Sequence, residues 1–100
     1  MERSNYRKSS EFYRLEKSIG DGYLAVAEFH TVVNGNIYYV EHEENESGRT
    51  TWIGKEHRIP GNNKEVGNKI YLKYKKDGYK FAGRYEMDIM GYKTKIWIRE

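Results

Sequence analysis

The stretch IYLKYKKDGYKFAGRYEMDIMGYKTKIWIR, residues 70–99, carries the clearest fold signal in the chain. Asp77-Gly78 suits a two-residue type I′ turn, which needs positive φ at both central residues. The residues on either side then face each other in register, with Tyr74 opposite Phe81, and apolar side chains fall on one face. The pattern therefore predicts a hairpin with one buried and one polar face.

A second turn signal, Met90-Gly91, extends this hairpin into a three-stranded meander. It places Arg84 opposite Trp97 and continues the same alternation of apolar and polar side chains. The two turns are identified independently, and both give the same arrangement of apolar and polar faces in one sheet, as expected when local signals agree with the fold. Residues 70–99 are therefore predicted to contain no helix.

Before residue 70 the chain also reads as short antiparallel strands. Asn34-Gly35 predicts a hairpin between strands at 23–33 and 36–42, because this dipeptide favours a type I′ turn. The remaining predicted segments are a mobile stretch at 1–9, a strand (or short helix) at 11–17, a return strand at 49–54 and a loop at 55–68 that contains Pro60-Gly61. No repeat or linker is visible, so one domain is predicted over residues 1–100.

Composition agrees with a small β domain whose core depends on tyrosine. The 100 residues include only three alanines and three leucines but eight isoleucines and ten tyrosines, which suit a pleated, half-buried surface. Tyrosine must supply much of the core and keep its hydroxyl at the rim. We therefore predict an all-β antiparallel barrel or strongly curled sheet of about six or seven strands, with hairpin and meander connections.

Several classes of protein are excluded by what the sequence lacks. No apolar run approaches the roughly 20 residues of a membrane-spanning helix, and no apolar signal-peptide segment follows Met1. Without cysteine the chain has no disulfide, no thiol nucleophile and no thiolate zinc site. These features predict a cytoplasmic protein with no membrane partner.

Charge is divided unevenly along the chain and concentrates on the predicted polar face of the meander. Residues 1–50 carry 6 basic and 9 acidic side chains, whereas residues 51–100 carry 12 basic and 6 acidic ones. Cationic side chains beside flat aromatic rings can neutralise phosphates and stack on unpaired bases. The predicted binding residues are Tyr71, Lys73, Lys75, Lys80, Arg84, Trp97 and Arg99.

The leading functional hypothesis is a non-enzymatic binding module for an anionic partner, with single-stranded nucleic acid as its most specific form. A solvated, lysine-rich face that keeps the protein soluble would show the same pattern. The alternative is a protein-interaction module, an inhibitor or assembly factor, that uses the acidic loop at 41–47 or a sheet edge. A third hypothesis is a β-barrel that holds a small apolar ligand in a tyrosine-lined interior.

One polar cluster on the first predicted hairpin is a candidate for acid–base chemistry. A type I′ register places Glu28 opposite Glu41 with His30 on the same face, and close carboxylates beside a histidine can push their pKa values apart. A shift of one residue would break this cluster. His30 and His42 would then share a face about 13 Å apart by strand rise, and no third zinc ligand lies at useful spacing. We predict no metal, no cofactor and no enzymatic activity.

One stretch resembles a known signature. Residues 35–40, GNIYYV, followed by Trp52-Ile53-Gly54 and Arg58, resemble the motif of the GIY-YIG nucleases over about 25 residues. The resemblance would imply a nuclease with a metal-binding glutamate on a following helix. Asn36 separates the glycine from the Ile-Tyr pair, Trp52 stands where the second tyrosine belongs, and strands are predicted in place of that helix. We therefore interpret the run as a β-hairpin.

Overall fold

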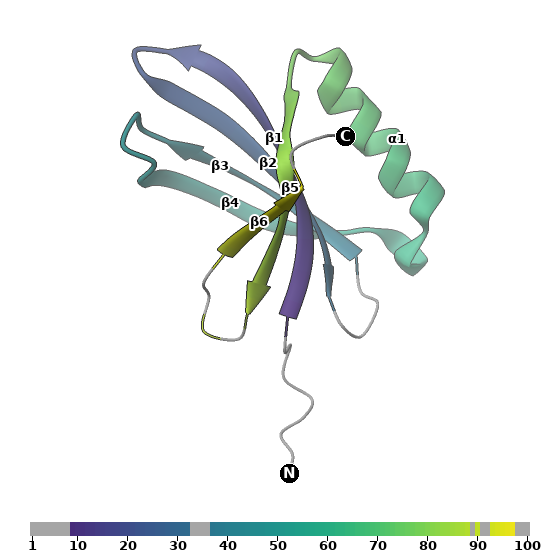
Figure 1. Ribbon diagram of the computed structural model, residues 1–100. Helices are drawn as coiled ribbons and strands as arrows, with labels where there is room; N and C mark the ends of the chain where they lie inside the picture. The colour runs from purple at the N-terminus through teal and green to yellow at the C-terminus, as the bar shows by residue number, and fades with distance from the viewer. Residues whose placement is uncertain (1–8, 33–36, 89, 91–92, 98–100) are drawn as a thin grey trace.

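One antiparallel sheet of six strands and one α-helix make up residues 9–32, 37–88, 90 and 93–97, the part of the chain that the computed structural model describes (Figure 1). The elements in chain order are β1 (Ser9–Gly20), β2 (Tyr23–Val32), β3 (Ile37–Glu44), β4 (Thr50–Arg58), a 3-10 turn (Pro60–Asn62), α1 (Lys64–Lys76), β5 (Lys80–Asp88) and β6 (Lys93–Trp97). The strand order is β4-β3-β2-β1-β5-β6, and the sheet is not closed. The predicted antiparallel, mostly β architecture is confirmed, but the helix was not predicted.

Helix α1 occupies residues that the pattern assigned to a loop and to the first strand of the meander, so both predictions are wrong. Asn63 starts the helix, because its side-chain oxygen accepts hydrogen bonds from the N–H groups of Glu65 and Val66 at 2.9 and 3.2 Å. One stripe of α1, which includes Ile70, then packs on the sheet. Leu72, which the predicted strand would bury, is 53% exposed.

The Asp77-Gly78 pair ends this helix instead of turning a hairpin. The N–H of Gly78 donates to the carbonyl of Lys75, and the N–H of Tyr79 donates to the carbonyl of Tyr74, both at 3.1 Å. With Gly78 at a φ of 102°, these bonds form a Schellman motif, in which glycine is favoured because it tolerates positive φ. The rings of Tyr74 and Tyr79 supply the accompanying apolar contact, edge to face at 5.0 Å.

The predicted strands of the first half are present, with one change of register. β1 pairs with β2, β2 with β3 and β3 with β4, all antiparallel. Glu28 lies opposite Val40 rather than Glu41, so the pairing is shifted by one residue and the predicted pair of carboxylates does not form. β4 also continues to Arg58, through residues predicted as loop. The turn at Asn34-Gly35 lies outside the described residues, as do residues 1–8.

The β5–β6 pairing agrees in part with the predicted meander. Arg84 lies opposite Trp97 as predicted, but Tyr85 lies opposite Lys95 rather than Ile96, because the register shifts between Arg84 and Tyr85. Lys93 and Lys95 therefore share a face with Tyr85 and do not lie beside Arg84.

Helix α1 covers one face of the sheet, which we call the helix face (Figure 1). Leu15, Ala27 and Phe29 form its buried centre. Partly buried side chains, five of the six aromatic, surround this centre: Tyr39, Ile70, Tyr71, Tyr74, Tyr79 and Phe81. The expectation that tyrosine supplies much of the core is confirmed on this face.

The opposite face, which we call the second face, is also buried at its centre, although α1 does not cover it. Phe12 is 2% exposed and Val26 is 0% exposed. Lys93 Nζ on β6 lies 3.5 Å from Glu28 Oε2 on β2, although β1 and β5 separate the two strands. Three strand spacings of roughly 4.8 Å lie between them in a flat sheet, so the sheet bends around the second face.

Candidate functional site

Four rings form a continuous stack on the second face. The ring centroids of Tyr85 and Phe12 lie 5.1 Å apart, those of Phe12 and His30 4.6 Å apart, and those of His30 and Tyr38 4.8 Å apart. The interplanar angles are only 7°, 22° and 6°, so the rings cover each other's faces. The row follows from the register, because its members are direct cross-strand neighbours.

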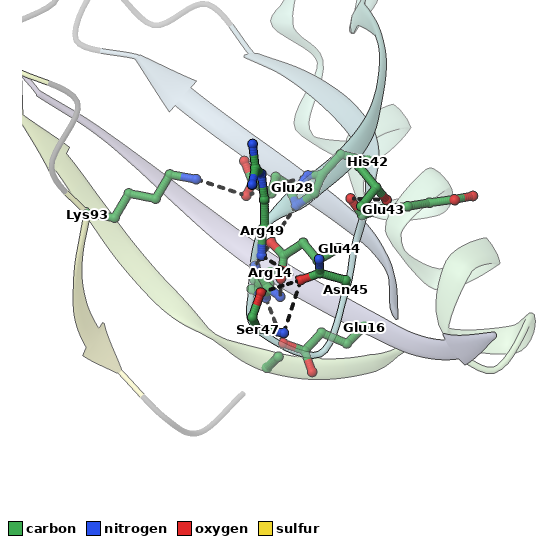
Figure 2. A network of polar contacts seen from close by, with 12 residues as sticks. Arg14, Glu16, Glu28, His42, Glu43, Glu44, Asn45, Ser47, Arg49 and Lys93 are labelled. Atoms are coloured by element: carbon green, nitrogen blue, oxygen red, sulfur yellow. Dashed lines mark hydrogen bonds and ion pairs between the residues drawn. The ribbon is translucent and has the colours of Figure 1, made fainter. Parts of the chain in front are cut away.

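Arg14 is the centre of an ion network on the same face (Figure 2). Its Nη1 and Nη2 donate to the two carboxylate oxygens of Glu44 at 2.8 and 2.7 Å, and its Nε donates to Glu16 at 2.7 Å. His42 Nε2 lies 2.7 Å from the same Glu44 carboxylate. The bidentate Arg14–Glu44 pair is a strong form of ion pair, and it joins β1 to β3 across β2.

Glu28 connects this network to the stacked row. Its Oε1 lies 2.9 Å from His30 Nε2, and its Oε2 lies 4.0 Å from His42 Nδ1. Figure 2 shows Lys93 pointing toward Glu28 from β6. The side chains of Glu28 and His30 are 6% and 4% exposed, so their charges and hydrogen bonds are sheltered from water.

The network keeps its carboxylates ionised. The hydrogen bond from Arg14 lowers the pKa of Glu44 to about 2, against an opposing effect of burial. Burial alone would raise the pKa of Glu28, but the hydrogen bond with His30 and the charge of Lys93 outweigh it and lower that pKa. An ionised carboxylate can only accept, so His30 donates from Nε2. His30 Nδ1 has no hydrogen-bond partner among the described residues.

Paired glutamates and histidines can do acid–base chemistry, but this network faces inward. His30 and His42 are 3% and 5% exposed, so a substrate has little access to either ring. No cluster of three or more His, Asp or Glu side chains that could hold a metal occurs within the described residues. The arrangement joins β1, β2, β3 and β6.

The predicted cluster of Glu28 with Glu41 is wrong because of the shifted register. Glu41 lies on the helix face, where its carboxylate accepts a hydrogen bond from the Tyr74 hydroxyl. Burial, together with this hydrogen bond, raises the pKa of Tyr74 far above its ordinary value. Burial also raises the pKa of Tyr79, helped by the nearby charge of Glu41. Glu41 therefore fastens the end of α1 to β3.

The helix face carries an open cleft of about 650 Å³ between α1 and the sheet. Its walls come from α1 and from β1, β2, β3 and β5. Its lining includes four aromatic rings and two cations: Tyr13, Phe29, Tyr71, Phe81, Lys64 and Arg84. A concave site with aromatic walls and a few polar groups is typical of ligand-binding pockets.

A bulge in β5 brings Arg84 to this cleft. Tyr13 pairs with Arg84 and Leu15 pairs with Phe81, so β5 contains one extra residue between the two pairs. Gly83, within the bulge, has a φ of 122°. The extra residue turns Arg84 to the same face as Phe81, whereas the predicted regular alternation put them on opposite faces.

Two neighbouring rings flanked by two cations form a row beside the cleft. Lys75 Nζ lies 5.9 Å from the Tyr71 ring centroid, and the Tyr71 and Tyr13 rings lie 5.9 Å apart at 70°. Arg84 Cζ lies 5.3 Å from the Tyr13 ring centroid, and its Nη2 donates to Glu11 at 2.9 Å. We call Lys75, Tyr71, Tyr13 and Arg84 the cation–ring ladder.

Three of the predicted binding residues, Tyr71, Lys75 and Arg84, are brought together in this ladder. The fourth member, Tyr13, was not among the predicted residues. Its only sequence signal was its place in the alternation of residues 11–17. That these residues bind an anion remains a prediction.

The other predicted residues do not join the ladder. Lys73 lies on α1 but lines a separate cleft of about 600 Å³ beside Tyr39. Lys80 pairs with Glu16 and lies on the second face. The backbone of Trp97 lies opposite Arg84, and Arg99 lies outside the described residues. The single basic sheet face predicted from residues 70–99 is therefore wrong, because α1 replaces its first strand.

The predicted acidic loop at 41–47 is also largely a strand, because β3 continues to Glu44. Glu44 is held by Arg14, which removes it from the predicted docking patch. The turn itself forms around Asn45, whose side-chain oxygen accepts hydrogen bonds from the N–H groups of Ser47 and Arg49 at 3.0 and 3.1 Å.

No protein-family model matches the chain, and no curated protein or solved structure matches it either. The GIY-YIG resemblance implies a helix after the motif, and a helix does follow β4, although strands were predicted there. Tyr38 of the motif is buried in the stacked row, however, and Trp52 is 49% exposed on an edge strand. No helix in the described part of the chain is long and apolar enough to span a membrane.

Proposed function

We propose that this protein is a non-enzymatic binding module for an anionic partner, and that the partner binds at the cation–ring ladder. The observation that carries the proposal is the row Lys75, Tyr71, Tyr13 and Arg84, in which two cations flank two rings beside an open cleft. Cations offer charge neutralisation and flat rings offer stacking, which is the combination that single-stranded nucleic acid needs.

The charge around the cleft favours an anion. Lys64 and Arg84 line it, and among the described lining residues the one carboxylate is that of Glu11, which pairs with Arg84. The Arg84–Glu11 pair is 41% and 48% exposed, and ion pairs this exposed contribute about 0–1 kcal/mol. A phosphate can therefore replace Glu11 at little cost.

The position of the titratable groups supports binding over catalysis. The Glu–His contacts with the geometry for proton transfer lie on the second face, at Glu28 and Glu44, with the sheet between them and the ladder.

The test is a titration of a fluorescent single-stranded oligonucleotide at several salt concentrations, starting at about 50 mM. The logarithm of the affinity should fall linearly with the logarithm of the salt concentration, by about 0.7 for each phosphate neutralised. Lys75→Glu should weaken binding and make this slope shallower. Lys80→Glu is the matched control, because it changes the charge equally on the second face, and it should bind nearly as the wild type does. Absence of binding at high micromolar protein would contradict the proposal.

A second candidate function, interaction with another protein, is favoured by the edge strand β4. All its residues except Gly54 are exposed, and Ile53 is 67% exposed. An exposed edge can accept a strand from a partner protein, although two irregularities in the β3–β4 pairing limit the length of flat edge. A complex that resists high salt, is lost in Ile53→Lys and is retained in Lys75→Glu would support this function over anion binding.

A further inference from the structure

We infer that the cleft between α1 and the sheet takes one unpaired base of a single-stranded nucleic acid, with its phosphate at the cations of the edge. This inference rests on the proposed function and adds how the ligand is recognised: a base ring inserts into the cleft, in addition to the attraction between its phosphate and the cations.

The first argument is the orientation of the rings in the cleft. Tyr71 meets Tyr13 at 70° and Phe29 at 71°, and Tyr13 meets Phe81 at 55°. Rings in tilted or edge contact leave part of each face uncovered by the other. The stacked row on the second face is the opposite case, because its rings lie within 22° of parallel and cover one another. Tyr13, whose contacts with Tyr71 and Phe81 are of the tilted kind, is therefore the ring on which a further ring can stack.

The second argument is access. Tyr13 is 40% exposed although it lies on the sheet face that α1 covers. The cleft volume of about 650 Å³ lies within the roughly 300–1,000 Å³ of small-molecule sites. A cleft of this size takes a single ring with its substituents. The bases of a duplex are stacked and paired, so only an unpaired base can enter.

The third argument is the placement of polar groups around the rings. Arg84 lies over one face of Tyr13, and Lys64 lies at the first turn of α1 on the cleft wall. Either cation can reach a phosphate at the mouth of the cleft while the base lies inside. Asn68 and Thr31 also line the cleft and offer hydrogen bonds to base edges.

The experiment compares a single-stranded oligonucleotide with an abasic strand of the same length and the same number of phosphates, both titrated against the wild-type protein. Stacking of a base on aromatic side chains is worth a factor of about 5 to 150 in affinity, so the abasic strand should bind weaker by that factor.

Two variants locate the ring site. Tyr13→Leu keeps an apolar side chain but removes the flat face, and it should abolish most of the preference for the base-containing strand over the abasic strand. Tyr23→Leu is the matched control, because Tyr23 is 41% exposed and is not part of the cleft lining; it should keep the preference.

The possible results separate the inference from the proposed function. Equal affinity for the two strands, with salt dependence retained, would overturn ring insertion and leave anion binding standing. If neither strand bound, both the inference and the proposed function would be overturned. A preference for the base-containing strand that survives Tyr13→Leu would also overturn the inference, because the ring would then bind elsewhere.

Discussion

The two faces of this sheet are stabilised by different forces. The helix face buries Leu15, Ala27 and Phe29 under a helix, and its aromatic rings meet mostly at steep angles around an open cleft. The second face is not covered by α1 and is closed by an ion network around Arg14 and by a row of parallel rings. The face that α1 covers is therefore the more open one, and the face with the ion network is the more closed.

This difference has a physical cause. Apolar packing is non-directional and tolerates a cleft at its margin, provided that enough area is buried elsewhere. Buried charges need a partner in good geometry, because an unpaired one costs several kcal/mol. We therefore expect the second face to be sensitive to changes in its buried charges, and the helix face to tolerate ligands and substitutions at its edge.

The largest effect is expected from Arg14→Ala. This change leaves Glu44 and Glu16 without their cation, and breaking a buried ion pair costs about 3–5 kcal/mol. The free energy of unfolding in denaturant measures it, against a total of about 5–15 kcal/mol for a protein of this kind. Arg84→Ala is the control, because its ion pair is exposed and should cost less than about 1 kcal/mol. Equal costs would show that burial of the network does not matter.

A comparable or smaller loss is expected from Leu15→Ala on the helix face. Leu15 is 0% exposed, and truncation of a buried leucine costs about 2–5 kcal/mol through lost contacts and the cavity left behind. Leu72→Ala, at a position that is 53% exposed on α1, should change the unfolding free energy little. If Leu72→Ala were the more damaging variant, the orientation of α1 on the sheet would be wrong.

Low pH should weaken the ion network of the second face but leave the apolar packing of the helix face nearly unchanged. The pKa of Glu44 is lowered to about 2 in the folded protein and that of Glu28 is also lowered, so their stabilising contribution is full above the ordinary pKa near 4.5 and is lost as the pH falls toward 2. Unfolding free energies measured between pH 7 and pH 2 should therefore converge for the wild type and Glu44→Gln. The difference between the wild type and Leu15→Ala should stay nearly constant. A constant difference for Glu44→Gln would contradict the assignment.

The smallest effect is expected at the start of α1. Asn63→Ala removes the side-chain acceptor for two N–H groups and should cost about 1 kcal/mol. Asn68→Ala, within the same helix, should be neutral or slightly stabilising, because alanine is the better helix former. Thermal unfolding followed by circular dichroism checks both. A destabilisation by Asn68→Ala alone would mean that the helix is held by contacts of Asn68 rather than by its cap.

The strands before residue 58 could be predicted because their signals are local. Alternation indicated β1, and Asn34-Gly35 indicated the β2–β3 pair. The register of that pair could not be predicted, because it depends on a turn whose length the dipeptide alone does not determine. The helix was missed for two local reasons. The apolar pattern of residues 70–76 is too short to distinguish a strand from a helix. Asp77-Gly78 suits the Schellman motif at the end of a helix as well as the turn of a hairpin.

The candidate site was predicted in part. Tyr71 and Arg84 were both predicted as binding residues on the polar face of the meander. Both contact Tyr13, but Tyr71 does so from α1 and Arg84 from β5. The bulge at Gly83 that turns Arg84 to this face carries no strong sequence signal beyond the glycine itself. The Arg14–Glu44 pair joins residues 30 positions apart on strands that do not pair directly, so no local pattern indicates it.

The position of the ion network in the chain also affects the order of folding. Apart from Lys93, all its members lie on β1, β2 and β3, which are consecutive in the chain and pair antiparallel with one another, whereas the helix face needs α1 and β5 from later in the chain. Contacts between strands that are close in sequence form at a small entropic cost, so these three strands are suited to form the folding nucleus, with docking of α1 following. We expect Arg14→Ala to slow refolding, and Tyr74→Phe, at the end of α1, mainly to speed unfolding. As the chain is synthesised, the Arg14 network would form first, and the cleft would take shape only when the last third has emerged.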